Sequence, residues 1–370
     1  MALVPTGDIS LGGSTTGQSI ALELGLSATA TISLNDTVVR TLLGIASGAI
    51  DMNTAHGKSN RVTASYTFTT NTTNAALNVS TLSGYSAGRS DITITVNTGI
   101  YLWASTTANN GLTLTGGATG DAITLVNNGF IMGCGGAGGG DFLGTTYPAP
   151  EATGLPGGPA ISLAYPITIN NTNPVAYIGG GGGGGAGRGD TSGGGGAGGA
   201  NGGPIARLPA SWPGKGGAIG ATGTPGTAFC SGCCTFGAGG GGGRVFPGTG
   251  GVGAFQPGNV LPHKQNGTGA PGGGGGGGPA WPVSGNQGGP GGSGNLAGTP
   301  STPYPYGGGG GGGGWGAAGG TTAASAGCIN CIPGTYLAHT GGTGGKAVTL
   351  NGKTVTWVSG CTTRVYGSVA

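Results

Sequence analysis

Contiguous runs of glycine are the feature that most constrains the fold of this chain. The longest, Gly307–Gly314, has eight glycines in a row. Four shorter runs precede it: Gly179–Gly185, Gly193–Gly196, Gly239–Gly243 and Gly272–Gly278. Glycine has no side chain to bury, and it loses more backbone entropy on ordering than any other residue. Such a chain is therefore either a flexible linker or a structure built from packed backbone.

Composition favours packed backbone over a flexible linker. Residues 1–128 hold 15 of the 97 glycines, so the glycine is concentrated in residues 129–370. Disordered chains are usually charged and poor in apolar residues, whereas this chain is 35% hydrophobic and 6% charged. The runs also nearly lack the serine that is typical of flexible linkers. We therefore predict that the glycine-rich region is ordered.

The contiguity of the runs indicates what kind of backbone packs. Collagen requires glycine strictly at every third position, so it is excluded. An extended helix with three residues per turn projects its N–H and C=O groups sideways, where they need partners when buried. Neighbouring copies can supply these partners because only hydrogen projects between their backbones. At a rise of about 3.1 Å per residue, eight residues span roughly 25 Å.

The first 60 residues predict a small helical module. The stretch Gln18–Leu24 has helical character and stops at a glycine. A second short helix is expected to start at Asn35 or Asp36, which can cap it, and to end before Gly44. Asn and Asp are favoured at helix N-termini, and glycine is favoured just past C-termini.

Residues 61–128 have the alternation of a β-domain with one buried face. Apolar residues alternate with Thr and Ser in two stretches: Val62, Ala64, Tyr66 and Phe68, then Ile92, Ile94 and Val96. A repeat of Ala, Ile or Val, Thr or Ser, and Leu occurs at 122–125, 160–163 and 347–350. These copies bracket the glycine region and adjoin Asn-rich turns. We therefore expect rungs of a parallel or intertwined β-structure whose first and last parts meet.

The charges are few and scattered. The net charge is +3, with 6 acids and 4 bases up to residue 128 and then 3 acids and 8 bases. No basic block is present, so we expect no nucleic-acid partner. No apolar run is long enough to span a bilayer and no secretion signal is visible at the N-terminus, so we expect no membrane insertion. No cofactor is predicted.

The N-terminal stretch also contains short blocks in a characteristic order. These blocks are Pro5–Leu11, Glu23–Gly25, Val39–Arg40, Leu43–Gly44, Ser47–Met52 and Gly57–Ser59. With this pattern the stretch resembles a module found near the N-termini of tailed-bacteriophage tail and fibre proteins. Such modules look like connectors. The resemblance implies attachment to the virion through other phage tail or fibre proteins.

The glycine region, residues 129–345 with the five runs above, is similar to the glycine-rich adhesins at the fibre tips of T-even-type bacteriophages. The segment Gly344–Trp357 resembles a C-terminal segment common in phage fibre and tail-tip proteins. The adhesin resemblance implies a packed layer of polyglycine II helices. It also implies distal loops that bind a receptor on the host bacterial surface, either an outer-membrane protein or a polysaccharide. This chain departs from the small adhesins by carrying its own N-terminal module, so monomer and homotrimer both remain open.

The segments between the runs join aromatic residues and arginine to prolines and glycines. Rigid loops with Trp, Tyr or Arg anchors lose little entropy on binding and are typical of interface hot spots. The receptor-binding candidates are Arg207, Trp212, Phe236, Phe246, Phe255, Trp281, Tyr304 and Tyr306. The alternative is that some of these aromatics cover the glycine layer. Trp315, directly after the longest run, is the residue most expected to pack in this way.

Cysteine spacing leaves the state of the thiols open. The seven cysteines are Cys134, Cys230, Cys233, Cys234, Cys328, Cys331 and Cys361. Cys230 with Cys233, and Cys328 with Cys331, form two C-x-x-C motifs whose four thiolates could hold zinc. However, 94 residues lie between the two motifs, which is far from a compact finger spacing. Disulfides that staple the loops and plain reduced thiols are the alternatives, and the odd count leaves at least one thiol unpaired within the chain.

Motifs typical of enzymes are weak. The segment Gly84–Gly88 matches G-x-S-x-G, but a nucleophile elbow joins a strand to a helix, and here a strand is expected to follow. The glycine region contains only three carboxylates, Asp141, Glu151 and Asp190. We therefore expect no enzymatic activity, with a depolymerase as the third hypothesis.

These patterns predict a mainly β protein with a small α-containing N-terminal module and a glycine-rich domain of packed polyglycine II helices flanked by short β-rungs. The expected domains are an attachment module (1–60), a β-domain (61–128), a glycine-rich adhesin domain (129–345) and C-terminal strands that close on it (346–370). The expected function is a virion-located receptor-binding adhesin, made in the host cytoplasm and acting outside the cell. The alternative is a purely structural tail or fibre component whose glycine region is a spacer or assembly joint.

Overall fold

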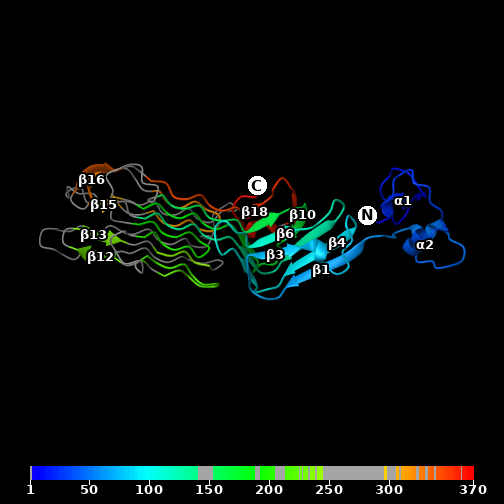
Figure 1. Ribbon diagram of the computed structural model, residues 1–370, viewed down its shortest axis with the longest axis horizontal. Helices are drawn as coiled ribbons and strands as arrows, with labels where there is room; N and C mark the ends of the chain where they lie inside the picture. The colour runs from blue at the N-terminus through cyan, green and yellow to red at the C-terminus, as the bar shows by residue number, and fades with distance from the viewer. Residues whose placement is uncertain are drawn as a thin grey trace. The chain divides into compact units, whose positions relative to one another are not determined.

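The fold is described from a computed structural model (Figure 1). It describes residues 2–140, 153–187, 192–204, 213–224, 226, 228–231, 234–237, 240–244, 296–297, 306–307, 310–321, 325–329, 332–336, 339–359 and 361–370. The chain divides into two compact units. Unit 1 comprises Met1–Tyr66, Val79–Thr93 and Gly116–Thr124, and unit 2 comprises Thr67–Asn78, Ile94–Thr115 and Leu125–Ala370. In the described part of the chain, no helix is long and apolar enough to cross a membrane.

Two short α-helices and one 3₁₀ turn form the start of unit 1. They are α1 (Ile20–Glu23), α2 (Thr37–Leu43) and η1 (Met52–Ala55). The hydroxyl of Ser19 caps α1 by accepting a hydrogen bond from the Leu22 N–H. Gly44 ends α2 with a φ of 76°, a left-handed conformation that glycine adopts without strain. Both predicted helices are confirmed, although α1 is shorter than the predicted stretch.

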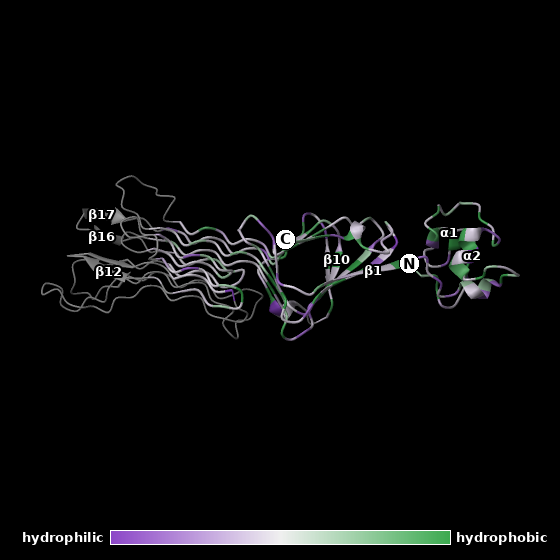
Figure 2. Cartoon of the chain, turned by 60° about the horizontal axis from the view of Figure 1, so that its bottom comes forward, coloured by the Kyte–Doolittle hydropathy of each residue, from purple (hydrophilic) through white to green (hydrophobic). Residues whose placement is uncertain are grey.

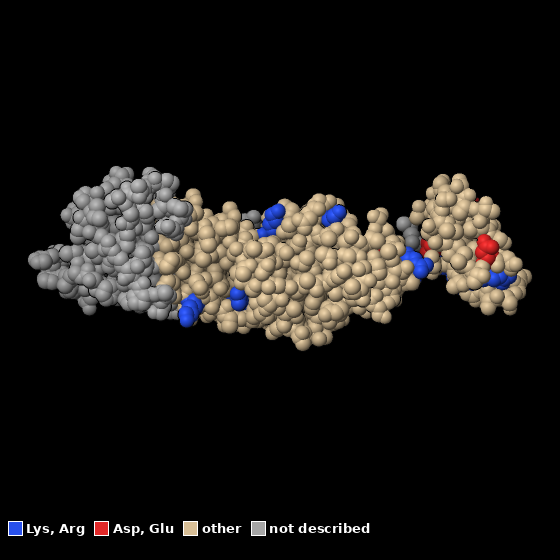
Figure 3. All heavy atoms as spheres, viewed as in Figure 1, with Lys and Arg blue, Asp and Glu red and all other residues tan. Residues whose placement is uncertain are grey.

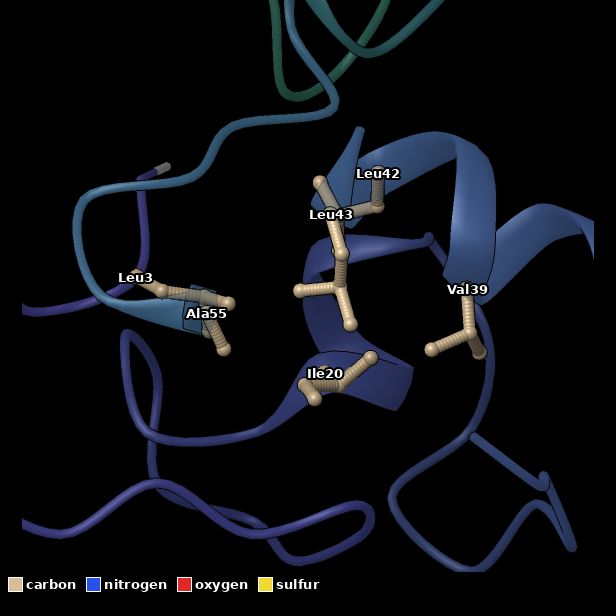
Figure 4. Close-up of a cluster of buried hydrophobic side chains, with 6 residues drawn as sticks. All are labelled: Leu3, Ile20, Val39, Leu42, Leu43 and Ala55. Atoms are coloured by element: carbon tan, nitrogen blue, oxygen red, sulfur yellow. The ribbon is translucent and has the colours of Figure 1, made fainter. Parts of the chain in front are cut away.

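A small apolar core holds this module together. Its side chains come from the N-terminal segment, both helices and the 3₁₀ turn: Leu3, Ile20, Val39, Leu42, Leu43 and Ala55 (Figure 4). Figure 2 shows the same difference in hydropathy: the two helices are coloured largely as hydrophobic, whereas the glycine segments are mostly pale, which marks intermediate hydropathy. The core explains why so short a helical segment is ordered, since helices of this length are marginal without tertiary packing.

The strands form three larger sheets, and the chain visits them in rotation. The first sheet contains β1 (Val62–Phe68), β4 (Ser90–Val96), β7 (Ala122–Asn127), β10 (Ile167–Asn170) and β19 (Val355–Trp357). The second contains β2 (Thr72–Thr73), β5 (Tyr101–Trp103), β8 (Phe130–Met132), β11 (Tyr177–Gly179) and β20 (Val365–Tyr366). The third contains β3 (Ala75–Asn78), β6 (Leu112–Thr115), β9 (Ile161–Leu163) and β18 (Val348–Thr349). Successive strands thus form coils with one strand in each sheet, as in a three-sided parallel β-helix.

Apolar side chains stack in register inside these coils. In the second sheet Leu102 pairs with Ile131, which pairs with Ile178. In the third sheet Leu112 pairs with Ile161, which pairs with Val348. All six side chains are buried and the pairings are parallel. The predicted parallel rungs with one buried face are therefore confirmed.

The three copies of the repeat do not all lie in one sheet. The copies at 160–163 and 347–350 do pair, through Ile161 and Val348. The copy at 122–125 lies in the first sheet, on β7, while the true neighbour of Ile161 is Leu112 on β6. Both β6 and β7 alternate Leu or Ile with Thr, so this alternation does not show which of the three sheets a strand joins.

The glycine segments are insertions into the coils. One leaves after β8 and returns at β9, and the other leaves after β11 and returns at β18. Strands on either side of the longer insertion are paired, since β10 adjoins β19 and β11 adjoins β20. The prediction that the first and last parts of the region meet is confirmed. The strands β8 to β11 fall within the predicted range 129–345, yet they share sheets with strands of 61–128.

Among its described residues, the longer insertion contains three two-stranded antiparallel pairs. They are β12 (Ala228–Ser231) with β13 (Cys234–Gly237), β14 (Leu296–Ala297) with β15 (Tyr306–Gly307), and β16 (Ser325–Ile329) with β17 (Ile332–Tyr336). The predicted mainly β class with a small helical module is confirmed.

Candidate functional site

The glycine lattice is the candidate scaffold of the functional site. It comprises the described parts of 133–140, 153–158, 180–187, 192–204, 213–217, 240–243, 310–320 and 340–345. Its backbone hydrogen bonds change partner with a period of three residues. Gly181 and Gly184 donate to Gly158 and Leu155, Gly182 and Gly185 donate to Ala197 and Gly194, and Gly183 and Ala186 donate to Ala317 and Gly320, at 2.8 to 3.0 Å. One extended segment is thus bonded to three neighbours in turn.

Every side of a central segment faces another backbone. A Cβ added to Gly183 would lie 1.9 Å from the carbonyl oxygen of Gly342, and one added to Gly184 would lie 1.8 Å from that of Ala137. A Cβ on Gly185 would lie 2.0 Å from the oxygen of Gly310. Three consecutive positions therefore contact three different segments. This explains why the runs are contiguous. A glycine at every third position would leave room for a neighbouring backbone on only one of the three sides of the segment.

A cluster of large side chains lies where the lattice meets the second sheet in unit 2. Trp315 is fully buried and packs with Met132, Ala197 and Tyr366. The ring of Tyr101 stacks on that of Phe130 with centroids 4.4 Å apart. Phe130 stacks with Tyr177, and Tyr177 with Tyr366, at 6.2 and 6.1 Å. The expectation that Trp315 is a packing residue is therefore confirmed.

Arg244 and Cys134 lie close together in the lattice. The Arg244 Nε donates to the carbonyl of Gly198 at 3.0 Å. Burial raises the pKa of the Cys134 thiol, and the nearby Arg244 guanidinium partly opposes this shift. Cys134 is buried and not in a disulfide. Its raised pKa keeps it protonated at neutral pH, which is the unreactive form of a thiol.

The charged side chains in the described part of unit 2 are all positive. They belong to Lys215, Arg244, Lys346, Lys353 and Arg364. Figure 3 shows isolated Lys and Arg atoms on this face and no broad charged patch. The Arg364 side chain stabilises the backbone around it, because its Nε donates to the Ala176 carbonyl and its Nη2 donates to the Asn171 carbonyl. Among the residues described, no group of three or more His, Cys, Asp or Glu could hold a metal ion.

Most of the predicted receptor-binding residues lie outside the described residues. These are Arg207, Trp212, Phe246, Phe255, Trp281 and Tyr304. Phe236 lies in β13 and Tyr306 in β15, so both belong to the antiparallel pairs. Of the cysteines considered for zinc, Cys230 lies in β12 and Cys328 in β16, while Cys233 and Cys331 lie outside the described residues.

The aromatic column of Tyr101, Phe130, Tyr177 and Tyr366 was not singled out from the sequence. A signal was present, because an aromatic residue precedes Leu or Ile at three successive rungs: Tyr101–Leu102, Phe130–Ile131 and Tyr177–Ile178. These dipeptides mark the outer and inner faces of one sheet, since Leu102, Ile131 and Ile178 are fully buried. The unequal spacing between them, caused by the insertions, hides the repeat.

The architecture defines a class of protein in which a coiled β-sheet scaffold carries a lattice of glycine backbone. The family model described as phage tail fibre adhesin Gp38 matches residues 63–370. This is well over half of the chain, so the protein belongs to the Gp38 family of phage tail fibre adhesins. It is accordingly a tail fibre component of a bacteriophage virion.

One solved structure is similar to this chain. It is the crystal structure of the gp37-gp38 adhesin tip complex of the bacteriophage S16 long tail fibre, with 20% sequence identity and a TM-score of 0.35. The match covers 98% of this chain and 100% of that one. The comparison with curated proteins gave no match.

Proposed function

We propose that this protein attaches the phage to its host by binding a cell-surface receptor through the segments between its glycine runs. Membership of the tail fibre adhesin family is the observation that carries the proposal. The receptor is an outer-membrane protein or a polysaccharide of the bacterial surface. Binding is non-covalent and involves no catalysis.

We further infer that the glycine segments are packed polyglycine II helices. Their hydrogen bonds repeat every three residues, which is the number of residues per turn of this helix. The side-chain-free contacts of Gly183, Gly184 and Gly185 with three different segments support the same inference. Such a lattice is a rigid base, and rigid presentation lowers the entropy lost when a loop binds its partner.

Residues that flank the proposed binding segments are hydrogen-bonded within the lattice, which supports the proposal. β12 and β13 lie between residue 224, whose N–H donates to the Lys215 carbonyl, and residue 240, whose carbonyl accepts from Gly195. The segment 245–305 lies between Arg244, which is bonded to the lattice, and β15. We propose that this segment holds the strongest anchors, Trp281 and Tyr304, with Phe236 and Tyr306 beside it.

Residues 1–60 are the proposed connection to other tail or fibre proteins. The family model begins at residue 63, directly after this module. The module has its own apolar core, centred on Ile20, Val39 and Leu43. A segment with an apolar core of its own, outside the adhesin match, suits a part that is bound by the virion rather than by the host.

Competition for adsorption tests the proposal. Purified full-length protein is incubated with a bacterial strain that the phage infects, and the rate of phage adsorption is then measured. We expect the protein to block adsorption. The double variant Trp281→Ala with Tyr304→Ala should need at least about 30-fold more protein, because the loss of even one hot spot typically costs about 2 kcal/mol.

Tyr66→Ala is the matched control, since it removes an exposed aromatic from unit 1. This variant should compete as well as the unmodified protein. Failure of the unmodified protein to bind cells or slow adsorption would contradict receptor binding and favour the structural alternative.

A further inference from the structure

The connection between the N-terminal module and the first strand is bonded along its whole length. Residues 57–61 lead from η1 to β1, and each of these five, like Val62 at the start of β1, takes part in a hydrogen bond within unit 1. Flexible connectors are instead rich in small residues whose backbone is solvated. We propose that this connection is a fixed joint rather than a tether, and that Arg61 is the side chain that closes it.

On the module side, the connection is anchored first through its backbone. The Leu3 N–H donates to the Lys58 carbonyl at 2.8 Å, and the Gly57 N–H donates to the Leu3 carbonyl at 3.2 Å. Residues 57 and 58 are thereby paired with the first residues of the module. The exit of the chain from the module is fixed beside its entry.

Glu23 at the end of α1 holds the next two residues. Its Oε1 accepts a hydrogen bond from the Asn60 N–H at 2.8 Å and another from the Ser59 hydroxyl at 3.2 Å. A carboxylate that accepts from a backbone N–H makes a stronger bond than a neutral acceptor. Residues 59 and 60 are therefore held by the module although they lie beyond its last turn.

Arg61 makes the opposite attachment, to the start of β4 and to the loop that precedes β7. Its Nε donates to Asp91 Oδ1 at 2.7 Å, its Nη2 to the Ser90 carbonyl at 2.7 Å, and its Nη1 to the Gly120 carbonyl at 2.9 Å. The side chain is only 15% exposed. The planar guanidinium donates in three directions at once, which the single ammonium of lysine does not reproduce.

The acceptors of Arg61 are themselves held in place. The Ser90 N–H donates to Asp121 Oδ1 at 3.1 Å, and the Ser90 hydroxyl donates to the Ser86 carbonyl at 2.8 Å. The Tyr85 hydroxyl donates to the other oxygen of Asp121 at 3.0 Å. Arg61 therefore binds a preformed surface, and β1 begins at the next residue, where the Val62 N–H donates to the Arg89 carbonyl.

A fixed joint has a consequence within unit 1. The module would set the direction in which β1 starts at Val62, instead of letting this strand swivel on a flexible connection. The inference is separate from the proposed function, because it holds whatever the module binds.

Trypsin tests the joint directly, since it cleaves after Lys58 and Arg61. In the full-length protein we expect both bonds to be resistant under native conditions. Arg61→Lys keeps a trypsin site and the positive charge but loses the three-way contact. We expect cleavage after residues 58 and 61 to become about tenfold faster in this variant. Local opening of the joint no longer has to break the three hydrogen bonds of the Arg61 guanidinium, so the open form is more populated. Glu23→Gln should have the same effect at Lys58, with fragments identified by mass spectrometry.

Asp8→Asn is the control, because it removes an exposed carboxylate from the same module. It should leave the cleavage rates unchanged. Thermal unfolding of each variant must match that of the unmodified protein, so that faster cleavage reports the joint and not global unfolding. Cleavage of the unmodified protein after Lys58 and Arg61 as fast as in the Arg61→Lys variant would overturn the proposal.

Discussion

Individual glycines in the lattice are fixed by contacts on every side of the backbone. At Gly182, an added Cβ would approach the oxygen of Gly313 to 2.1 Å, and at Gly196 it would approach that of Gly182 to 1.9 Å. Ala318, in contrast, is exposed and already carries a Cβ. The sequence predicted that glycine would serve as packed backbone. It did not predict which segments touch, because a residue without a side chain carries no information about its neighbour.

Gly184→Ala is expected to destabilise the protein strongly. The new Cβ would lie 1.8 Å from the Ala137 oxygen and 2.4 Å from its carbonyl carbon. Because both atoms belong to backbone that is itself hydrogen-bonded, the strain should reach at least about 3 kcal/mol, the upper range for overpacking. Chemical denaturation measures the loss. Ala318→Ser is the control and should change stability by less than about 0.5 kcal/mol. Equal stability of both variants would contradict the lattice geometry.

At the scale of elements, the helices and the alternating strands followed from local pattern, as at Gly44 after α2 and at Ile92 and Ile94 in β4. The way in which the strands close into coils did not follow from local pattern. Pairs such as Tyr101 with Phe130 are separated by turns, and Phe130 and Tyr177 also by an insertion. Pairing at such distances depends on which turn returns the chain to which sheet, and residue alternation is the same in each sheet.

Trp315 joins two elements, the lattice and the second sheet. Trp315→Ala should lower stability by about 3 to 5 kcal/mol, the usual cost of truncating a large buried aromatic. The side chain is fully buried against Met132 and Tyr366, so its removal leaves a cavity. Thermal and denaturant unfolding provide the measurement. Val175→Ala, at a side chain 49% exposed, is the control and should have little effect. A Trp315→Ala variant as stable as this control would show that the junction does not depend on the indole.

At the scale of the whole molecule, framework and proposed recognition are carried by different parts of the chain. The coils and the glycine lattice hold the described core of unit 2, including Leu102, Ile131 and Trp315. The residues chosen from sequence for binding, such as Trp281 and Tyr304, lie outside the described residues. Aromatic residues next to proline indicate anchors, but sequence alone does not separate anchors for a receptor from anchors for the lattice. Trp315 was correctly predicted as a packing residue because it directly follows the longest glycine run and is therefore part of the framework.

Exchange of the segment 245–305 tests the central claim most directly. Two full-length proteins are purified, this one and a version carrying the corresponding segment of a relative with a different host. Binding of each to cells of both hosts is then measured. The account predicts that binding follows the exchanged segment while the thermal stability of the lattice stays the same. Binding that follows the unexchanged part of the chain would contradict it.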